Sequence, residues 1–260
     1  MERAAERNIP DVAVARVSAV LGAFDADHRE LRLSEISRRC GLPKSTTSRL
    51  VAGLVVYGFL ERSGTLLHLG RRLSELGRLG MGRRDLRAVA LPYLVDLREA
   101  TRQSVQLAVL DGTDVVLLEI LRGPNTPEPL AAGGRLPAHA CAPGKALLAC
   151  SDEAAVALVC ARPLTAIGPR TVLTPASLRR QLNLVRESGL AYESEESGPG
   201  VGGVACAILH ADGRPVAAVA VTGWSGRLNP RALGPAVRTV ALAVGREFCP
   251  STSAHCRRCR

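Results

Sequence analysis

Residues 31–62 constrain this chain more than any other segment, because two short amphipathic stretches flank a glycine and a proline. The first stretch, residues 34–40, opens with a serine that we expect to cap a helix. Gly41 and Pro43 mark a tight turn, and the second stretch covers residues 44–57. This arrangement predicts a helix-turn-helix, in which the second helix lies in the major groove of DNA.

The two faces of the second stretch differ in chemistry. Apolar residues recur on one helical face, at Leu50, Val51, Leu54 and Val55. The opposite face carries small, hydroxylated or cationic residues, namely Ser45, Arg49 and Ala52. Small residues let a helix approach the bases, arginine reads guanine with two hydrogen bonds, and hydroxyl groups reach phosphate. We therefore predict groove and phosphate contacts from Lys44, Ser45, Thr46, Ser48 and Arg49, supported by Arg38 and Arg62.

Charge and the residues that follow support this prediction. Residues 32–72 hold eight arginines or lysines against two glutamates, in a chain of net charge +10. Residues 59–69 read as a β-hairpin around Ser63 and Gly64, which would form a wing beside the groove. A strand at 31–33 is expected to pair with this wing. The alternative is that two amphipathic helices form an ordinary core, since short motifs give many false positives.

Helical periodicity also precedes and follows this unit. A helix over 11–24 has an apolar stripe for packing beneath the helix-turn-helix, formed by Val14, Val17, Val20, Leu21 and Phe24. Residues 70–101 are mostly helical, with a break at Gly80 and Gly82 and a kink or restart at Pro92. Before the break, one side is lined by Leu73, Leu76 and Leu79. We expect this segment to be a linker and a contact with a second subunit.

Beyond residue 101 the pattern changes from helical to alternating. Strands are expected at 104–110, 114–121, 203–210 and 215–221, paired as two hairpins. Helices are expected at 143–150, 152–160, 175–188 and 230–248. Strand pairs with helices between them predict an α+β domain on an antiparallel sheet. The expected domains are residues 8–70, a linker helix at 71–88, residues 89–248, and a disordered tail at 249–260.

Composition excludes several classes of protein. A hydrophobic fraction of 47% excludes general disorder, and no apolar run reaches the roughly 18 residues that span a bilayer. The charged N-terminus lacks a signal core, so we expect a cytoplasmic protein without a membrane partner. The tail groups four residues that can bind metals, Cys249, His255, Cys256 and Cys259. Because this tail reads as disordered, we expect neither a metal nor a cofactor.

Several segments, in order along the chain, resemble the IclR family of bacterial transcriptional regulators. They are the DNA-reading segment at 41–62, the end of the wing at 67–70, the hallmark loop and helix LPAHACAPGKALLA at 136–149, the acidic stretch GLAYESEE at 189–196, and the last core strand VAAVAVTG at 216–223. Each segment alone is a weak match, whereas the ordered set is specific. The resemblance covers about residues 10–248.

The resemblance implies a winged helix-turn-helix followed by an effector domain of GAF/PAS-like architecture. It also implies a homodimer or homotetramer, and a small-molecule effector that is commonly an organic acid. The pocket residues of the family fall here on Ala142, Pro143, Gly144, Glu193, Gly203 and Thr222. The chain departs from the family at one position, because Gly203 stands where Gly-Val-x-Cys often has its cysteine. This departure predicts a wider pocket or a polar contact from elsewhere.

The residues themselves give a second argument for an anion. A helix that opens after a loop at residue 144 directs backbone N–H groups toward a carboxylate, from Gly144, Lys145 and Ala146. The alternative is that these N–H groups bind local carbonyl groups. Thr222 would donate a hydroxyl, whereas Glu193 would oppose an anion unless it pairs with a cation or binds a ligand hydroxyl. The glutamates at 193, 195 and 196 read more simply as a solvated acidic loop than as a metal or acid–base site.

No pattern indicates catalysis. His139 and Cys141 are two residues apart in an extended segment, so their side chains would face opposite ways. Gly144-Lys145 lacks the upstream glycine of a P-loop. We therefore predict a ligand-responsive, sequence-specific DNA-binding regulator and not an enzyme. The alternatives are a small-molecule-binding enzyme and an interaction module, in either of which the winged helix serves dimerisation. Turnover would identify the enzyme, and DNA affinity that falls with salt would exclude the interaction module.

Overall fold

A computed structural model describes residues 13–25, 28–80, 86–124, 127 and 133–249. The chain divides into two compact units, residues 1–83 and 84–260. Apart from Cys249, the metal-ligand types of the C-terminal tail lie outside the described residues. Within the part of the chain that the structure describes, no helix is both long and apolar enough to cross a membrane.

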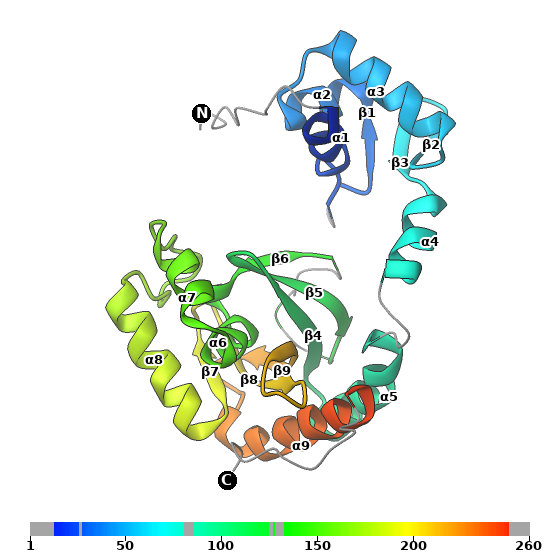
Figure 1. Ribbon diagram of the computed structural model, residues 1–260. Helices are drawn as coiled ribbons and strands as arrows, with labels where there is room; N and C mark the ends of the chain where they lie inside the picture. The colour runs from blue at the N-terminus through cyan, green and yellow to red at the C-terminus, as the bar shows by residue number, and fades with distance from the viewer. Residues whose placement is uncertain (1–12, 26–27, 81–85, 125–126, 128–132, 250–260) are drawn as a thin grey trace. The chain divides into compact units, whose positions relative to one another are not determined.

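The N-terminal unit is a winged helix-turn-helix, as predicted. Its elements are α1 (Ala13–Leu21), β1 (Glu30–Arg32), α2 (Leu33–Cys40), α3 (Lys44–Val56), β2 (Leu60–Ser63), β3 (Leu66–Leu69) and α4 (Arg71–Gly80). β3 lies between β1 and β2 in an antiparallel three-stranded sheet (Figure 1). The predicted strand at 31–33 is therefore present one residue earlier, and it pairs with the wing as expected. The wing turns at Gly64 and Thr65, one residue later than predicted.

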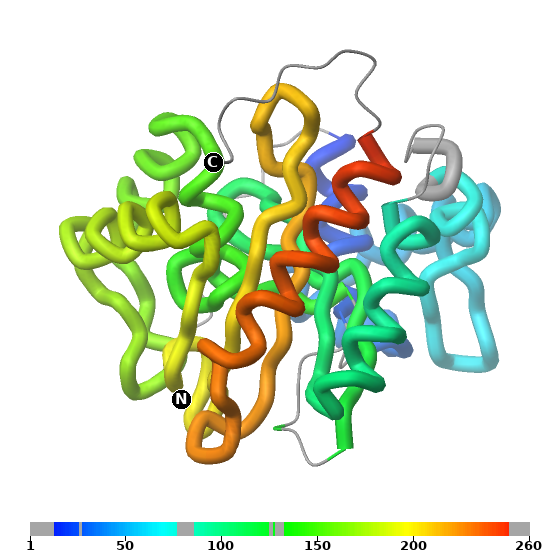
Figure 2. Tube along the Cα trace, turned by 90° about the horizontal axis from the view of Figure 1, so that it is seen from below, coloured from blue at the N-terminus to red at the C-terminus, as the bar shows by residue number. Residues whose placement is uncertain are grey.

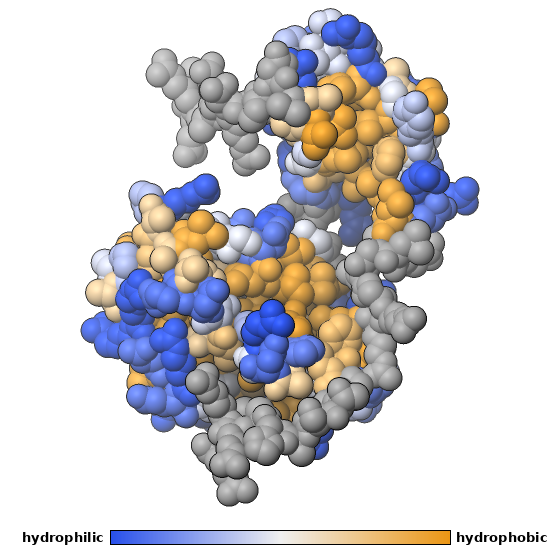
Figure 3. All heavy atoms as spheres, in the orientation of Figure 1, coloured by the Kyte–Doolittle hydropathy of each residue, from blue (hydrophilic) through white to orange (hydrophobic). Residues whose placement is uncertain are grey.

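Two expectations about this unit are wrong in detail. Helix α2 begins at Leu33, so Ser34 lies in its first turn and does not cap it. Instead, the Glu35 carboxylate accepts the backbone N–H of Arg32 at 2.7 Å, which satisfies one of the donors that a helix start leaves open. Val14 is 72% exposed rather than packed beneath the helix-turn-helix. Figure 3 shows apolar residues gathered over α1 on the viewed face of this unit.

The C-terminal unit belongs to the predicted α+β class. Its helices are α5 (Leu86–Thr101), the short 3-10 helix η1 (Ala138–Ala140), α6 (Ala142–Cys150), α7 (Glu153–Cys160), α8 (Pro175–Ser188) and α9 (Pro230–Phe248). Its strands are β4 (Ser104–Asp111), β5 (Asp114–Leu121), β6 (Arg135–Pro137), β7 (Ala191–Ser194), β8 (Val201–Leu209) and β9 (Pro215–Trp224). They form one antiparallel sheet in the order β6-β5-β4-β9-β8-β7. Helix α5 runs through Pro92 without a restart.

Helices cover both faces of this sheet. One apolar cluster joins α6, α7 and α8 to the sheet, and a second joins α5 and α9 to its other face. Figure 2 shows α5 and α9 side by side across the strands. Because β4 and β9 lie in the middle, both of their faces are buried along most of their length, which explains their nearly continuous apolar sequences. A polar residue in either strand is therefore inside the domain.

Candidate DNA-binding surface and effector pocket

Buried hydroxyl groups fix the turn between α2 and α3. Gly41 has a φ of 70°, which glycine adopts without strain. The Ser37 hydroxyl donates to the carbonyl oxygen of Leu42 at 2.7 Å. The Thr47 hydroxyl donates to the carbonyl oxygen of Pro43 at 3.0 Å. Sequence patterns pointed to neither hydroxyl, although each sets the direction in which α3 leaves α2 by satisfying a turn carbonyl.

Helix α3 presents its predicted DNA-reading residues on one side. Successive steps of about 100° place the exposed positions of the helix within a little over a third of its circumference. They are Lys44, Ser45, Ser48, Arg49, Ala52 and Val56. The buried positions on the other side are Thr47, Val51 and Leu54. Thr46 is half-buried and lies on the flank between the two sides. The structure thus brings together four of the five predicted α3 contacts and leaves Thr46 at their edge.

The cations of this surface differ in how they are engaged. Arg38 and Arg62 are exposed, on α2 and on the wing. Among the described residues, the side chains of Lys44 and Arg49 have no hydrogen-bond or ion-pair partner. Arg39, in contrast, donates from Nε to the carbonyl oxygen of Ala23 at 2.7 Å and forms an ion pair with Asp25. Arg39 therefore holds the end of α1 against α2, while the other cations stay available to a polyanion.

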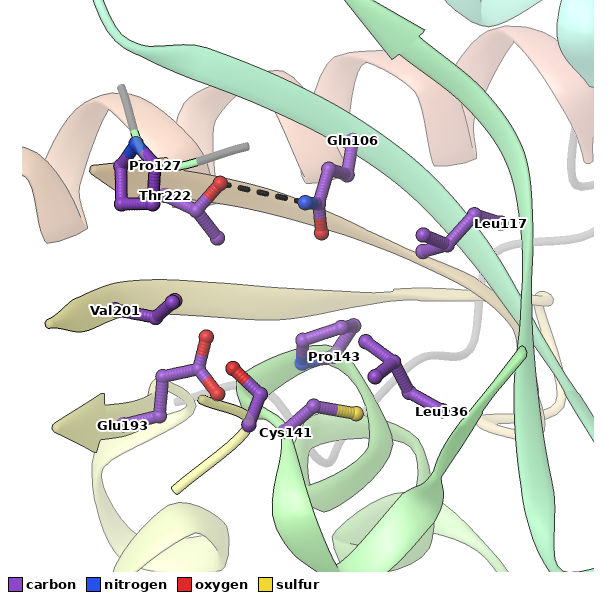
Figure 4. A pocket seen from close by; sticks show the side chains of 10 residues that line it. Gln106, Leu117, Pro127, Leu136, Cys141, Pro143, Glu193, Val201 and Thr222 are labelled. Carbon is purple, nitrogen blue, oxygen red and sulfur yellow. Dashed lines mark hydrogen bonds between the residues drawn. The ribbon is translucent and has the colours of Figure 1, made fainter. Parts of the chain in front are cut away.

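A small pocket lies in the C-terminal unit, where the N-terminus of α6 approaches the sheet. Its volume is about 80 Å³, and its lining consists of Gln106, Leu117, Pro127, Leu136, Cys141, Pro143, Glu193, Ser197, Val201 and Thr222. In Figure 4 the side chains of Gln106 and Thr222 lie on one side of the space. Glu193, Cys141 and Pro143 lie on the other. Gln106 donates from Nε2 to the Thr222 hydroxyl oxygen at 3.3 Å.

Three of the six predicted effector residues line this pocket, namely Pro143, Glu193 and Thr222. The other three do not line the pocket but contact or make room for groups that form it. The backbone N–H of Ala142 donates to Glu193 Oε2 at 3.2 Å. A Cβ at Gly144 would lie 2.2 Å from the carbonyl oxygen of Ala138, so Gly144 allows η1 and α6 to pack closely. A Cβ at Gly203 would lie 3.0 Å from Glu193 Oε1, which means that this glycine makes room for the carboxylate.

Sequence reasoning missed most of the remaining lining, including Gln106, Cys141 and Ser197. A signal existed for Gln106, because it is the one amide side chain within the otherwise apolar run of β4. It is only 6% exposed. No comparable signal exists for Ser197, which follows the short strand β7 and reaches the pocket through the tertiary fold.

The prediction of three free N–H groups at the start of α6 needs correction. The helix begins at Ala142, and the N–H of Lys145 already bonds to the carbonyl oxygen of Cys141 at 3.1 Å. Among the described residues, the backbone N–H of Ala142 is the one at this helix start that donates to a carboxylate. The positive end of the helix is therefore occupied by the protein's own Glu193.

The prediction of a solvated loop for the acidic stretch is wrong. Glu193 is 4% exposed and Glu196 is 6% exposed. The Lys145 ammonium, itself 1% exposed, lies 2.7 Å from Glu196 Oε1 and donates to the carbonyl oxygen of Tyr192 at 2.7 Å and to Gln181 Oε1 at 2.8 Å. Lys145 thus forms a buried ion pair with Glu196 and attracts the Glu193 carboxylate electrostatically, while its three donors are all used.

This arrangement perturbs the acid–base behaviour of the pocket. Burial raises the pKa of Glu193 to about 7, although Lys145, Ser197 and the Ala142 N–H favour the ionised form. Burial also raises the pKa of the Cys141 thiol far above its usual range, and the Glu193 charge adds to this effect. A thiol in that state is a poor nucleophile. His139 bonds through Nε2 to the carbonyl oxygen of Thr165 at 3.0 Å.

Together, a winged helix with an exposed cationic face and a separate domain with a small polar pocket define a ligand-responsive DNA-binding regulator. Two family models match the chain, the IclR helix-turn-helix domain over residues 13–64 and the bacterial transcriptional regulator IclR C-terminal domain over residues 80–246. The chain belongs to the IclR family of bacterial transcriptional regulators.

Known relatives support this assignment. The HTH-type transcriptional regulator XynR of Escherichia coli is 33% identical over 84% of this chain and 88% of its own length. The glycerol operon regulatory protein of Streptomyces coelicolor is 32% identical over 93% of this chain and 97% of its own length. The crystal structure of an IclR homologue from Microbacterium hydrocarbonoxydans, complexed with 4-hydroxybenzoate, has a TM-score of 0.82 and 33% identity, and the match covers 90% of this chain and 98% of that one.

Proposed function

We propose that this regulator reads its operator with α3. Lys44, Ser45, Ser48 and Arg49 contact the groove and phosphates, Thr46 contributes from the flank, and Arg38 and Arg62 bind flanking phosphates. The observation that carries this proposal is the exposed side of α3, where the cations lack internal partners while the opposite side is core. Unpaired cations on a rigid helix lose no internal contact when they bind phosphate.

The test is fluorescence anisotropy of the protein on duplex DNA from upstream of its own gene, against a scrambled duplex of the same length. We expect preference for the native duplex and an affinity that falls steeply with salt, because phosphate contacts release counterions. Arg49→Ala should weaken binding while leaving the unfolding transition unchanged. Arg180→Ala, which removes an exposed arginine on α8, is the matched control. Unchanged affinity of the Arg49 variant would remove this residue from the interface.

We further propose that the pocket of the C-terminal unit holds the effector, a small organic acid. Its support is the convergence of Gln106, Thr222, Ser197 and Glu193 on one partly apolar space, which is typical of ligand sites. A cavity of about 150 Å³ holds benzene, so a pocket of about 80 Å³ suits a smaller acid or opens around an aromatic one. The structural relative with bound 4-hydroxybenzoate makes that compound a sensible first ligand. Its addition should change DNA anisotropy, and Thr222→Val should reduce the response.

The proposal includes a homodimer, the symmetry expected of a protein that reads two half-sites. It rests on apolar side chains that the chain alone leaves open, Val14 at 72% and Leu76 at 44% exposed. Sedimentation equilibrium gives the oligomeric state, and Val14→Asp should shift it toward monomer. The proposal assigns no nucleophilic role to the Cys141 thiol of the pocket, because burial raises its pKa and keeps it in the unreactive form.

A further inference from the structure

The pocket contains an imbalance of charge that bears on what it binds. Among the described residues that line it, none is cationic, and the lining carboxylate is Glu193. The nearest buried cation, Lys145 of α6, is already bonded to Glu196, Gln181 and the Tyr192 carbonyl. With both glutamates ionised, the cluster has two negative charges and one positive charge. An anionic ligand would therefore enter a site that already has a surplus negative charge.

We propose that Glu193 makes ligand binding proton-coupled, so that a small organic carboxylate binds together with one proton, which Glu193 takes from solvent and donates in a hydrogen bond to the ligand. This inference rests on the effector site proposed above and deepens it. No covalent bond changes. The free protein with ionised Glu193, one ligand anion and one proton become a complex whose net charge is the same as that of the free protein.

The positions of the other groups favour this reading. Glu193 Oε2 is held by the Ala142 N–H at 3.2 Å, and Oε1 lies beside Gly203, where no side chain intervenes. The Thr222 hydroxyl accepts from Gln106, so its own hydrogen remains free to donate into the pocket. A carboxylate placed between Thr222 and a protonated Glu193 receives a hydrogen bond from each. An O–H donor to a carboxylate is among the stronger hydrogen bonds.

The charged and titratable groups that face Glu193 come from three directions. Lys145 lies on α6 and favours ionisation, Glu196 follows β7 and opposes it, and the Cys141 thiol precedes α6. On the sheet side, β8 presents Gly203 and β9 presents Thr222, which carry no charge. Because burial raises the pKa of Glu193 to about 7, its protonation state changes near neutral pH.

Magnitudes decide between protonation and simple repulsion. With a pKa of about 7 for Glu193, about a quarter of the molecules carry the proton at pH 7.5. The need for protonation therefore weakens binding by about fourfold relative to a fully protonated protein. Two like charges about 4 Å apart, at an effective dielectric constant of about 20, weaken binding by about a thousandfold. The ligand therefore gains far more by binding the protonated form than by binding beside a second anion.

The test is isothermal titration calorimetry of the full chain, without DNA, using benzoate and the smaller propionate as probes between about pH 6 and about pH 8.5, where both stay ionised. We expect the Kd to rise about 30-fold across this range. At pH 7.5, titrations in phosphate and in Tris should reveal uptake of about 0.8 proton per ligand bound. This second readout requires no variant.

Glu193→Gln is the decisive variant. Its side-chain amide keeps the shape of the carboxyl group and donates a hydrogen bond at any pH, without first taking up a proton. Its Kd should be independent of pH and close to the low-pH value of the wild type. Glu195→Gln removes the same charge from the partly exposed neighbour outside the pocket lining and should keep the wild-type profile. A flat wild-type profile would overturn the proposal, and so would binding of neither carboxylate at any pH. Failure to bind DNA in the anisotropy experiment would instead contradict the proposed regulator, and it would not affect the calorimetric result.

Discussion

The chain contains two lysines, and they occupy opposite environments. Lys44 opens α3 in the N-terminal unit, is exposed, and has no ion-pair partner among the described residues. Lys145 lies in α6 of the C-terminal unit, is 1% exposed, and is surrounded by three oxygen acceptors. The first is available to a partner from outside the chain, whereas the second has already been satisfied by the chain itself.

The difference shows how the two binding regions are built. On the DNA-binding surface, the core side of α3 sets the position of the helix, and the exposed side chains are free to bind. In the pocket, the lining carboxylate Glu193 also accepts the N–H at the start of α6, and the buried Lys145–Glu196 ion pair acts on it electrostatically. Changes on the exposed side of α3 should therefore alter binding alone, while changes in the pocket should alter stability and binding together.

The severest test of this contrast replaces Lys145 by methionine. Removing one partner of a buried ion pair leaves Glu196 without a counter-charge and should lower the free energy of unfolding by about 3–5 kcal/mol. Urea denaturation monitored by circular dichroism measures it. Lys44→Met is the matched control, with an expected change within about 0.5 kcal/mol. Equal stability of the two variants would mean that the network around Lys145 contributes nothing to folding.

The next effect is a dependence of stability on pH that belongs to Glu193. Its pKa is raised from 4.5 to about 7 in the folded chain. The folded state therefore keeps its proton where the unfolded chain has lost it. Relative to Glu193→Gln, the wild type has its full stability below about pH 4.5 and loses about 3 kcal/mol as the pH rises through about 7. Parallel denaturation curves for the two proteins from acid to neutral pH would contradict the buried, destabilised carboxylate.

On the DNA side, Arg49→Ala should change affinity without changing stability. We expect a loss of about 1–3 kcal/mol in binding free energy if the guanidinium reads a base. Anisotropy on a panel of single-base variants of the operator then shows relaxed preference at one position. The thermal midpoint should match that of the wild type, because no internal contact is lost. A variant that unfolds early would show that Arg49 is structural.

Gly203→Ala probes the space beside the pocket carboxylate. The added Cβ would lie 3.0 Å from Glu193 Oε1 and 3.1 Å from the Thr222 methyl group. We expect a destabilisation of about 1–2 kcal/mol, since tight packing absorbs an extra methyl group poorly. The pH profile of ligand binding should weaken at the same time, because the carboxyl is displaced. Gly53→Ala, where the added Cβ meets open space, is the control and should be neutral or slightly stabilising.

The smallest effect is expected from Lys44→Met on DNA. Loss of one phosphate contact should weaken binding to all sequences alike and reduce the slope of log affinity against log salt by about 1. Anisotropy at four salt concentrations resolves such a change. A slope equal to that of the wild type would place Lys44 away from the phosphates.

Prediction from sequence worked best where the signal is local. The periodicity of residues 44–57, the turn at Gly41 and the two-residue hairpins are local features, and the helix, the wing and the strand pairs follow them closely. It worked less well at Val14 and Ser34. An apolar stripe does not indicate whether its residues pack against their own chain or against another, and Val14 is exposed. Ser34 does not cap α2, because the helix begins one residue earlier and Glu35 accepts the N–H at its start.

The sequence by itself determined the helix-turn-helix, the α+β class and which side of α3 faces out, because the spacing of apolar residues along one segment decides these features. Only the tertiary structure decided the pocket. Glu193 and Glu196 look solvated in sequence, and they are buried because Lys145, some fifty residues earlier in the chain, supplies their counter-charge inside the domain. The free energy of a buried charge depends on groups that are distant in sequence and adjacent in space, so no local pattern records it.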